Sequence, residues 1–120
     1  MPVRAIIKRL ETPDETRTFE KGKFELATVG GMTIGRASYQ PGWKWSEHVG
    51  AATGATSCQV DHVGLVLAGH AKVLMDDGRE LDLTAGDLFA IGPGHDSWVV
   101  GDEPYVSLHF MGADRYASDS

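Results

Sequence analysis

The sequence predicts a single all-β domain, a sandwich or barrel of short strands, and three observations support this. The chain has 120 residues, which is enough for one hydrophobic core. Its 15 glycines exceed an average composition, and they separate short apolar runs without any three-residue period. These runs recur at roughly 8–12-residue spacing, as in β-sandwiches and barrels, and none sustains a helical period.

Strands and turns alternate along the chain. Residues 1–23 are mostly polar and charged, so we expect an N-terminal arm or an edge strand there. Residues 24–112 form the expected barrel, and residues 113–120 a loose C-terminal tail. Gly-Gly, Pro-Gly, Asp-Gly and Gly-Pro-Gly segments supply the turns. The expected strands cover residues 24–29, 32–39, 43–49, 60–68, 71–75, 80–83, 88–91, 97–100 and 105–111, with a loop at 50–57.

Composition and charge exclude several classes of function. The net charge of −6 argues against binding a nucleic-acid backbone. The basic residues near the N-terminus are interleaved with acidic ones, which indicates a solvated arm of mixed charge. No apolar stretch approaches the roughly 18 residues that span a membrane. A single cysteine, Cys58, cannot form an internal disulfide, so we expect a cytoplasmic protein.

Three turn-containing segments carry a resemblance to a known family. Residues 66–69, 75–78 and 83–94 (Val-Leu-Ala-Gly, Met-Asp-Asp-Gly and Leu-Thr-Ala-Gly-Asp through Gly-Pro-Gly) resemble the core of the cupin superfamily. In particular, the chain resembles small single-domain cupins with Pro-Gly-Trp-x-Trp-Ser-x-His and Pro-Gly-His-Asp-x-Trp segments, here residues 41–48 and 93–98. The resemblance covers about residues 35–112. It implies an RmlC-like jelly-roll barrel (a double-stranded β-helix), a small-molecule ligand and a homodimer.

The resemblance also implies a metal site. Cupins generally bind a metal through two histidines and a glutamate in one motif and a third histidine in a second. The first histidine falls on His48, the next position holds Gly50, and the glutamate position holds His62. The position of the last histidine holds Ser97, but His95 lies two residues earlier, on the same face of an extended strand. The implied ligands are therefore His48, His62 and His95.

Three neutral imidazoles can bind Zn²⁺, Fe²⁺, Mn²⁺, Ni²⁺ or Cu²⁺ and leave positions open for water or substrate. They carry no charge to offset the cation, so Glu47, Cys58 or Asp61 is a possible additional ligand. Strict alternation along residues 43–49 leaves open whether His48 or Glu47 faces the barrel. The alternative is that the histidines are ordinary polar residues at strand ends.

Aromatic residues lie beside the predicted site. Trp43, Trp45 and Trp98 are either walls of a ligand pocket or packing residues of the core. His109, in the last expected strand, either contributes to the pocket or lies outside it.

Three functions remain open at the level of the sequence. The first is a metal-dependent enzyme of cupin type, an oxidoreductase or isomerase, that acts on a small organic molecule. The second is a small-molecule-binding or sensor module without turnover. The third is a metal-free domain that forms a homodimer, for which the strand at 62–68, apolar on both faces, would supply a surface. No P-loop, dinucleotide-binding motif or nucleophile–base pair is present.

Overall fold

The computed structural model describes residues 5–113, and this range contains nine β-strands and one short α-helix. The strands are β1 (Glu15–Phe19), β2 (Gly22–Val29), β3 (Met32–Tyr39), β4 (His62–Ala68), β5 (His70–Met75), β6 (Glu80–Thr84), β7 (Leu88–Ile91), β8 (His95–Val99) and β9 (Tyr105–Met111). The helix α1 (Trp45–His48) and a 3₁₀ turn (Gly50–Ala52) lie between β3 and β4. The prediction of an all-β fold is confirmed.

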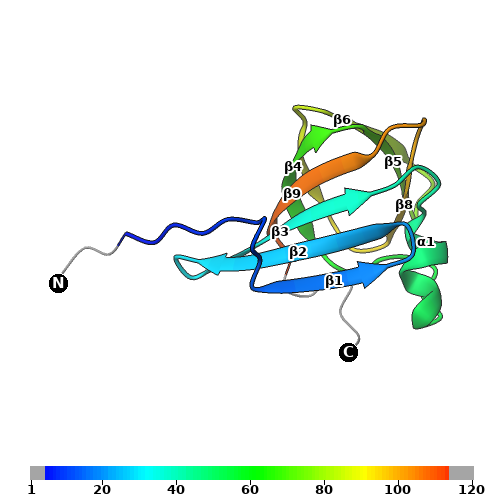
Figure 1. Ribbon diagram of the computed structural model, residues 1–120. Helices are drawn as coiled ribbons and strands as arrows, with labels where there is room; N and C mark the ends of the chain where they lie inside the picture. Colours follow the sequence, from blue (N-terminus) through cyan, green and yellow to red (C-terminus); the bar gives the residue numbers. More distant parts are fainter. Residues whose placement is uncertain (1–4, 114–120) are drawn as a thin grey trace.

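The strands form two antiparallel sheets that enclose the core (Figure 1). The larger sheet has the order β1-β2-β3-β9-β4-β7, and the smaller one has the order β6-β5-β8. Strands far apart in the sequence are neighbours, since β9 pairs with both β3 and β4. This arrangement is a jelly roll, in which alternate side chains of each strand point into the space between the sheets.

A single glycine carries the chain from one sheet to the other. Gly69 separates β4, in the larger sheet, from β5, in the smaller one. Its φ of +84° lies in the left-handed region, and a Cβ there would lie only 2.8 Å from Cα of Tyr105. Both constraints require glycine at this corner.

The expected strand at residues 43–49 is wrong. Only Lys44 makes a β-bridge, to Trp98, and helix α1 follows directly. The amide and hydroxyl groups of Ser46 both donate to the carboxylate of Asp96, at 3.0 and 2.7 Å. This carboxylate, from the distant strand β8, binds a free amide of the first helical turn, which favours the turn over an extended strand. The expected loop at 50–57 contains the 3₁₀ turn, and the remainder is irregular.

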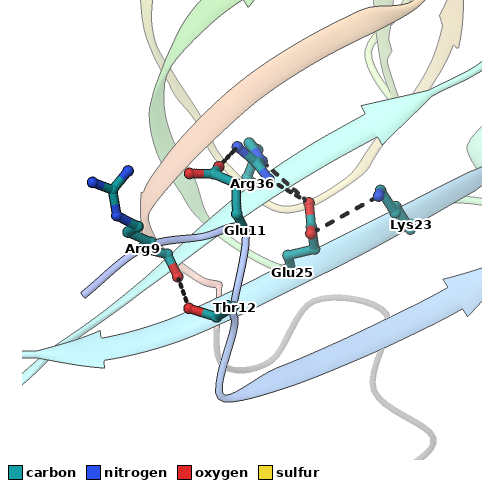
Figure 2. A network of polar contacts seen from close by, with 6 residues as sticks. All are labelled: Arg9, Glu11, Thr12, Lys23, Glu25 and Arg36. Carbon is teal, nitrogen blue, oxygen red and sulfur yellow. Dashed lines mark hydrogen bonds and ion pairs between the residues drawn. The ribbon is translucent and has the colours of Figure 1, made fainter.

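Charged side chains tie the N-terminal arm to the outer face of the larger sheet (Figure 2). The guanidinium of Arg36, on β3, donates to Glu25 on β2 at 3.0 Å and to Glu11 in the arm at 2.7 Å. Lys23 approaches the same Glu25 carboxylate at 3.9 Å. Basic and acidic groups therefore neutralise one another on this face, in agreement with the mixed charge of the sequence.

The two ends of the chain flank this body. Of residues 1–23, expected as an arm or edge strand, β1 lies at the edge of the larger sheet (Figure 1). Residues 5–9 form an arm, and a turn closed by the Thr12 amide on the Arg9 carbonyl leads from it towards β1. Residues 1–4 lie outside the described range, as does most of the expected tail at 113–120. Ala113, the last described residue, is buried. Among residues 5–113, no helix is long and apolar enough to cross a membrane.

Candidate metal site and pocket

Three buried side chains that commonly bind metals meet between the sheets. His62 begins β4, His95 begins β8, and Cys58 lies in the segment that precedes β4. One ligand atom from each of these residues lies within 4.8 Å of the other two. Cys58, His62 and His95 are therefore placed to hold a metal ion.

Backbone hydrogen bonds fix the distance between two of these residues. Cys58 and His95 form an isolated antiparallel bridge, in which the Cys58 amide donates to the His95 carbonyl at 2.6 Å. The amide of Gly94 donates in turn to the Cys58 carbonyl at 2.7 Å. The irregular segment that carries Cys58 is thus held against β8 by its main chain.

The imidazole of His95 is oriented for coordination. Its Nδ1 lies 2.7 Å from the carbonyl oxygen of Gly92. A carbonyl can only accept, so Nδ1 carries the proton and Nε2 keeps its lone pair. Such a hydrogen bond from the distal nitrogen is the usual way in which proteins orient a metal-binding histidine.

The distance between Cys58 and His62 fits a tetrahedral ion. Sγ of Cys58 lies 3.5 Å from Nε2 of His62. Zinc bonds to sulfur and nitrogen imply a separation of about 3.5 Å between two such ligands at the tetrahedral angle. The two atoms therefore already have the spacing that zinc would impose.

Burial sets the protonation states of the three groups. It lowers the pKa of His62 to about 3, with smaller contributions from the neighbouring His109 and His95. Burial also lowers the pKa of His95 and raises the pKa of the Cys58 thiol. Without a metal, the cluster at neutral pH consists of two neutral imidazoles and a neutral thiol. A bound cation would displace the thiol proton and no other.

A polar ladder on β9 adjoins the cluster. Tyr105, Ser107 and His109 alternate along the strand and all point inward, where they are buried. Ser107 Oγ lies 3.1 Å from Nε2 of His109, whose ring centre is 5.2 Å from that of His62. Burial lowers the pKa of His109 to about 4 and raises the pKa of Tyr105 to about 12. These groups are therefore neutral at pH 7.

A cavity of about 50 Å³ lies beside the cluster. The imidazoles of His62 and His95 form part of its wall, while Cys58 is not among the lining residues. Among the lining residues in the described range, none is Lys, Arg, Asp or Glu. The full lining consists of Tyr39, Trp43, Trp45, His62, Ala71, Val73, Leu83, Phe89, Ile91, His95, Ser97, Tyr105, Ser107 and His109.

Some of the predicted site residues lie elsewhere. Nδ1 of His48, in α1, accepts from the amide of Lys44 at 2.9 Å, and its Nε2 lies 3.0 Å from the Glu20 carboxylate. His48 is therefore engaged outside the cluster, because α1 replaces the strand on which its predicted position depended. Glu47 and Asp61 are exposed.

The aromatic predictions divide in the same way. Trp43, Trp45 and His109 line the cavity, whereas Trp98 does not. Trp98 is half-buried, with the ammonium group of Lys44 lying 5.5 Å from the ring centre. Tyr105 and Ser107 were not predicted as site residues, although their alternation with His109 was a signal that they share its face.

The fold resembles solved cupin structures. A sugar phosphate isomerase of the cupin superfamily from Silicibacter pomeroyi has a TM-score of 0.59 and 17% identity, over 84% of this chain and 71% of that one. A cupin-2 domain protein from Rhodospirillum rubrum has a TM-score of 0.55 and 15% identity, over 86% and 64%. The 11S allergen of Cocos nucifera has a TM-score of 0.60 and 14% identity, over 90% and 34%.

These similarities establish the cupin fold, which the sequence predicted. No protein-family model matches the chain, and no curated protein sequence matches it significantly. The solved structures show the fold, and within it Cys58, His62 and His95 are placed to hold a metal ion. The narrower likeness to the cupins with two tryptophan-containing segments stays a prediction.

Proposed function

We propose that Cys58, His62 and His95 bind one transition-metal ion, at which a small organic molecule binds from the cavity. The observation that carries this proposal is the convergence of three buried donor atoms within 4.8 Å. One thiolate and two imidazoles favour Zn²⁺, Fe²⁺, Ni²⁺ or copper over Mn²⁺, which prefers oxygen ligands. Three protein ligands leave a tetrahedral ion one open position, which is the pattern of catalytic rather than structural sites.

At such a metal site, different residues of this chain would have different roles. The Gly92 carbonyl orients His95, and the Cys58 thiolate would supply the negative charge at the ion. The aromatic and aliphatic side chains of the lining would pack against the apolar atoms of the ligand. The ion itself would supply Lewis acidity or activate a bound water.

The composition of the cavity wall favours a second candidate, a binding or sensor module without turnover. No Asp, Glu or Lys stands in the described lining as a general acid or base, and the histidines there are buried. The described lining also contains no Lys or Arg that could bind a phosphate group. The sugar phosphate chemistry of the Silicibacter pomeroyi neighbour therefore has no support in this pocket.

Metal analysis of purified protein tests the ion site. The protein would be stripped with a chelator, reloaded with Zn²⁺ or Co²⁺, desalted and measured for metal content. We expect one ion per chain, and a cobalt–thiolate charge-transfer band that Cys58→Ser removes. His62→Ala and His95→Ala should lose the ion. His48→Ala and His70→Ala should retain it, because His48 lies in α1 and His70, at the start of β5, has its imidazole 2.7 Å from the Asp82 carboxylate. Absence of a stoichiometric ion after reloading, or full retention in Cys58→Ser, would refute the site.

Turnover separates the two candidate functions. The reloaded protein would be incubated with panels of small acids, thiols and phenols, and O₂ uptake and product formation would be followed. Saturable binding without consumption of any compound favours the binding module. Metal-dependent consumption that His62→Ala abolishes favours the enzyme.

We also propose that the protein forms a homodimer through the outer face of β4, β7 and β9. Leu88 at the edge strand β7 is 78% exposed, and Leu67 and Met111 are exposed nearby on β4 and β9. A contiguous apolar face beside an unpaired sheet edge suits a self-complementary contact. Light scattering after gel filtration should give the dimer mass, and Leu88→Lys should give the monomer. A monomeric wild type would exclude this interface.

A further inference from the structure

Two buried indole groups line the cavity with their N–H donors unused. Trp43 is 1% exposed and Trp45 is 7% exposed, and both belong to the cavity wall. Neither Nε1 has a hydrogen-bond partner among the residues that the structure describes. A buried tryptophan N–H normally has an acceptor, so two unused donors at one cavity indicate that the acceptor comes from a ligand.

Packing holds both rings in place. Trp43 is stacked on Tyr39, with ring centres 3.8 Å apart and planes inclined by 5°. The benzene edge of Trp45 packs against Gly50, where an added Cβ would lie 2.8 Å from Cη2. The opposite edge of that ring, which carries Nε1, therefore faces away from Gly50. Tyr39 covers one face of the Trp43 ring, so a ligand cannot stack on that face. A ligand can still accept a hydrogen bond from Nε1 at the edge of the ring.

Charge balance selects the kind of acceptor. A divalent ion held by the Cys58 thiolate and two neutral imidazoles keeps one positive charge. Among the described lining residues none is Lys, Arg, Asp or Glu, and the carboxylates that act on His95 (Asp61, Asp76 and Asp96) lie outside the lining. A ligand with one negative charge would neutralise the site, whereas a cation would be repelled in surroundings that screen charge poorly.

The size of the cavity limits the ligand. A volume of about 50 Å³ corresponds to roughly three to five water-sized positions. The enclosed part of the ligand is therefore a small group, of the size of a carboxylate with one or two further carbon atoms.

We propose that Trp43 and Trp45 donate their indole N–H groups to the oxygens of a small monocarboxylic acid, which they select as the ligand of this cavity. The proposal rests on the proposed function, because the metal site supplies the countercharge. It adds the class of the ligand and identifies two specificity-determining residues.

Nuclear magnetic resonance of the indole N–H groups tests the proposal directly. Protein labelled with ¹⁵N-tryptophan gives three indole signals, which the three Trp→Phe variants assign. Acetate, with four non-hydrogen atoms, would be titrated into the zinc-loaded protein. Acetamidinium is the matched control, since it has the same planar shape but carries a positive charge and only donors.

The expected result is a saturable downfield shift of the Trp43 and Trp45 signals with acetate, and none with acetamidinium. The signal of Trp98, which lies outside the cavity, should not move. Trp45→Phe, which keeps a ring but removes the donor, should weaken acetate binding about tenfold to hundredfold, as expected for a hydrogen bond to a charged group. Trp98→Phe should bind acetate as the wild type does.

Three outcomes would overturn the proposal. These are no saturable shift with acetate, equal shifts with acetamidinium, and unchanged affinity in folded Trp45→Phe. If Trp45→Phe does not fold, the acetate titration of the wild-type protein still tests whether the indole groups bind the carboxylate. Metal content, measured on the same samples, keeps the two proposals apart. A bound ion without indole shifts refutes only the carboxylate site, whereas indole shifts in a protein that binds no ion refute only the metal site.

Discussion

The buried histidines should make the metal-free protein lose stability as the pH falls below 7. Burial holds the pKa of His62 at about 3 and that of His109 at about 4, against an ordinary value of 6.5. The unfolded chain therefore binds protons at a higher pH than the folded chain does. The stability contributed by these two groups is complete above pH 6.5 and declines as the pH falls towards their folded values.

The size of the effect follows from the two shifts. At about 1.4 kcal/mol per pKa unit, each histidine costs roughly 2 kcal/mol of stability between pH 7.5 and pH 5. The two together cost roughly 4 kcal/mol, which is a large part of the 5–15 kcal/mol of an ordinary domain. His95 adds a loss of the same sign, because burial lowers its pKa as well.

Urea denaturation at pH 7.5, 6 and 5, in the presence of a chelator, measures this loss. The test variant is His62→Gln, which removes a buried titrating group. The free energy of unfolding of His62→Gln should fall less with pH than that of the wild type, by roughly 2 kcal/mol at pH 5. Equal stability of the wild type at pH 7.5 and 5 would refute the assignment of neutral buried imidazoles.

Three further predictions concern packing, charge and the ion. Gly64→Ala should destabilise the protein by about 1–3 kcal/mol, because its Cβ would clash with the backbone carbonyl oxygen of Leu108 and lie 2.7 Å from the Phe89 ring. An unchanged urea midpoint would contradict this. Arg36→Ala should cost about 3 kcal/mol in thermal or urea unfolding, because it strips the buried Glu25 carboxylate of its guanidinium. Arg79→Ala, which removes the exposed ion pair between Arg79 and Asp77, should cost less than about 1 kcal/mol. If Arg36→Ala and Arg79→Ala cost the same, burial of Glu25 is not the reason for the larger loss. Zinc at a thousandfold excess over its Kd should stabilise the wild type by about 4 kcal/mol and Cys58→Ser by much less, as measured by the shift of Tm.

Most of the fold could be predicted because strand alternation and turn glycines are local signals. The turn expected at Asp76-Asp77-Gly78 does join β5 to β6, and Gly78 has a φ of +93°. The strand predicted at residues 43–49 was wrong because the contact that decides the structure there is not local. Their tryptophans alternate as in a strand, but the Asp96 carboxylate that supports the helical turn comes from fifty residues away.

The composition of the site was less accessible to prediction. His62 and His95 were chosen, like His48, by correspondence with the ligand positions of the family, and strand alternation placed His95 on the same face as the expected position at Ser97. Cys58 was one of several additional candidates, since its position depends on a backbone bridge from an irregular segment to β8. His48 was chosen by correspondence with a family motif, which assumed a strand where the chain forms α1. The two indole donors had no signal, because whether a buried N–H finds an acceptor depends on the whole cavity.

The bridge between Cys58 and His95 has a consequence for how fast an ion would exchange. Because the thiolate and the imidazole are attached to hydrogen-bonded backbones, neither ligand can swing away by rotating a flexible loop. Complete release would require the segment before β4 to detach from β8, which is a local opening of the fold. Metal exchange should then follow the amide hydrogen exchange of Cys58 and Gly94, and the ion would leave slowly even where its affinity is modest.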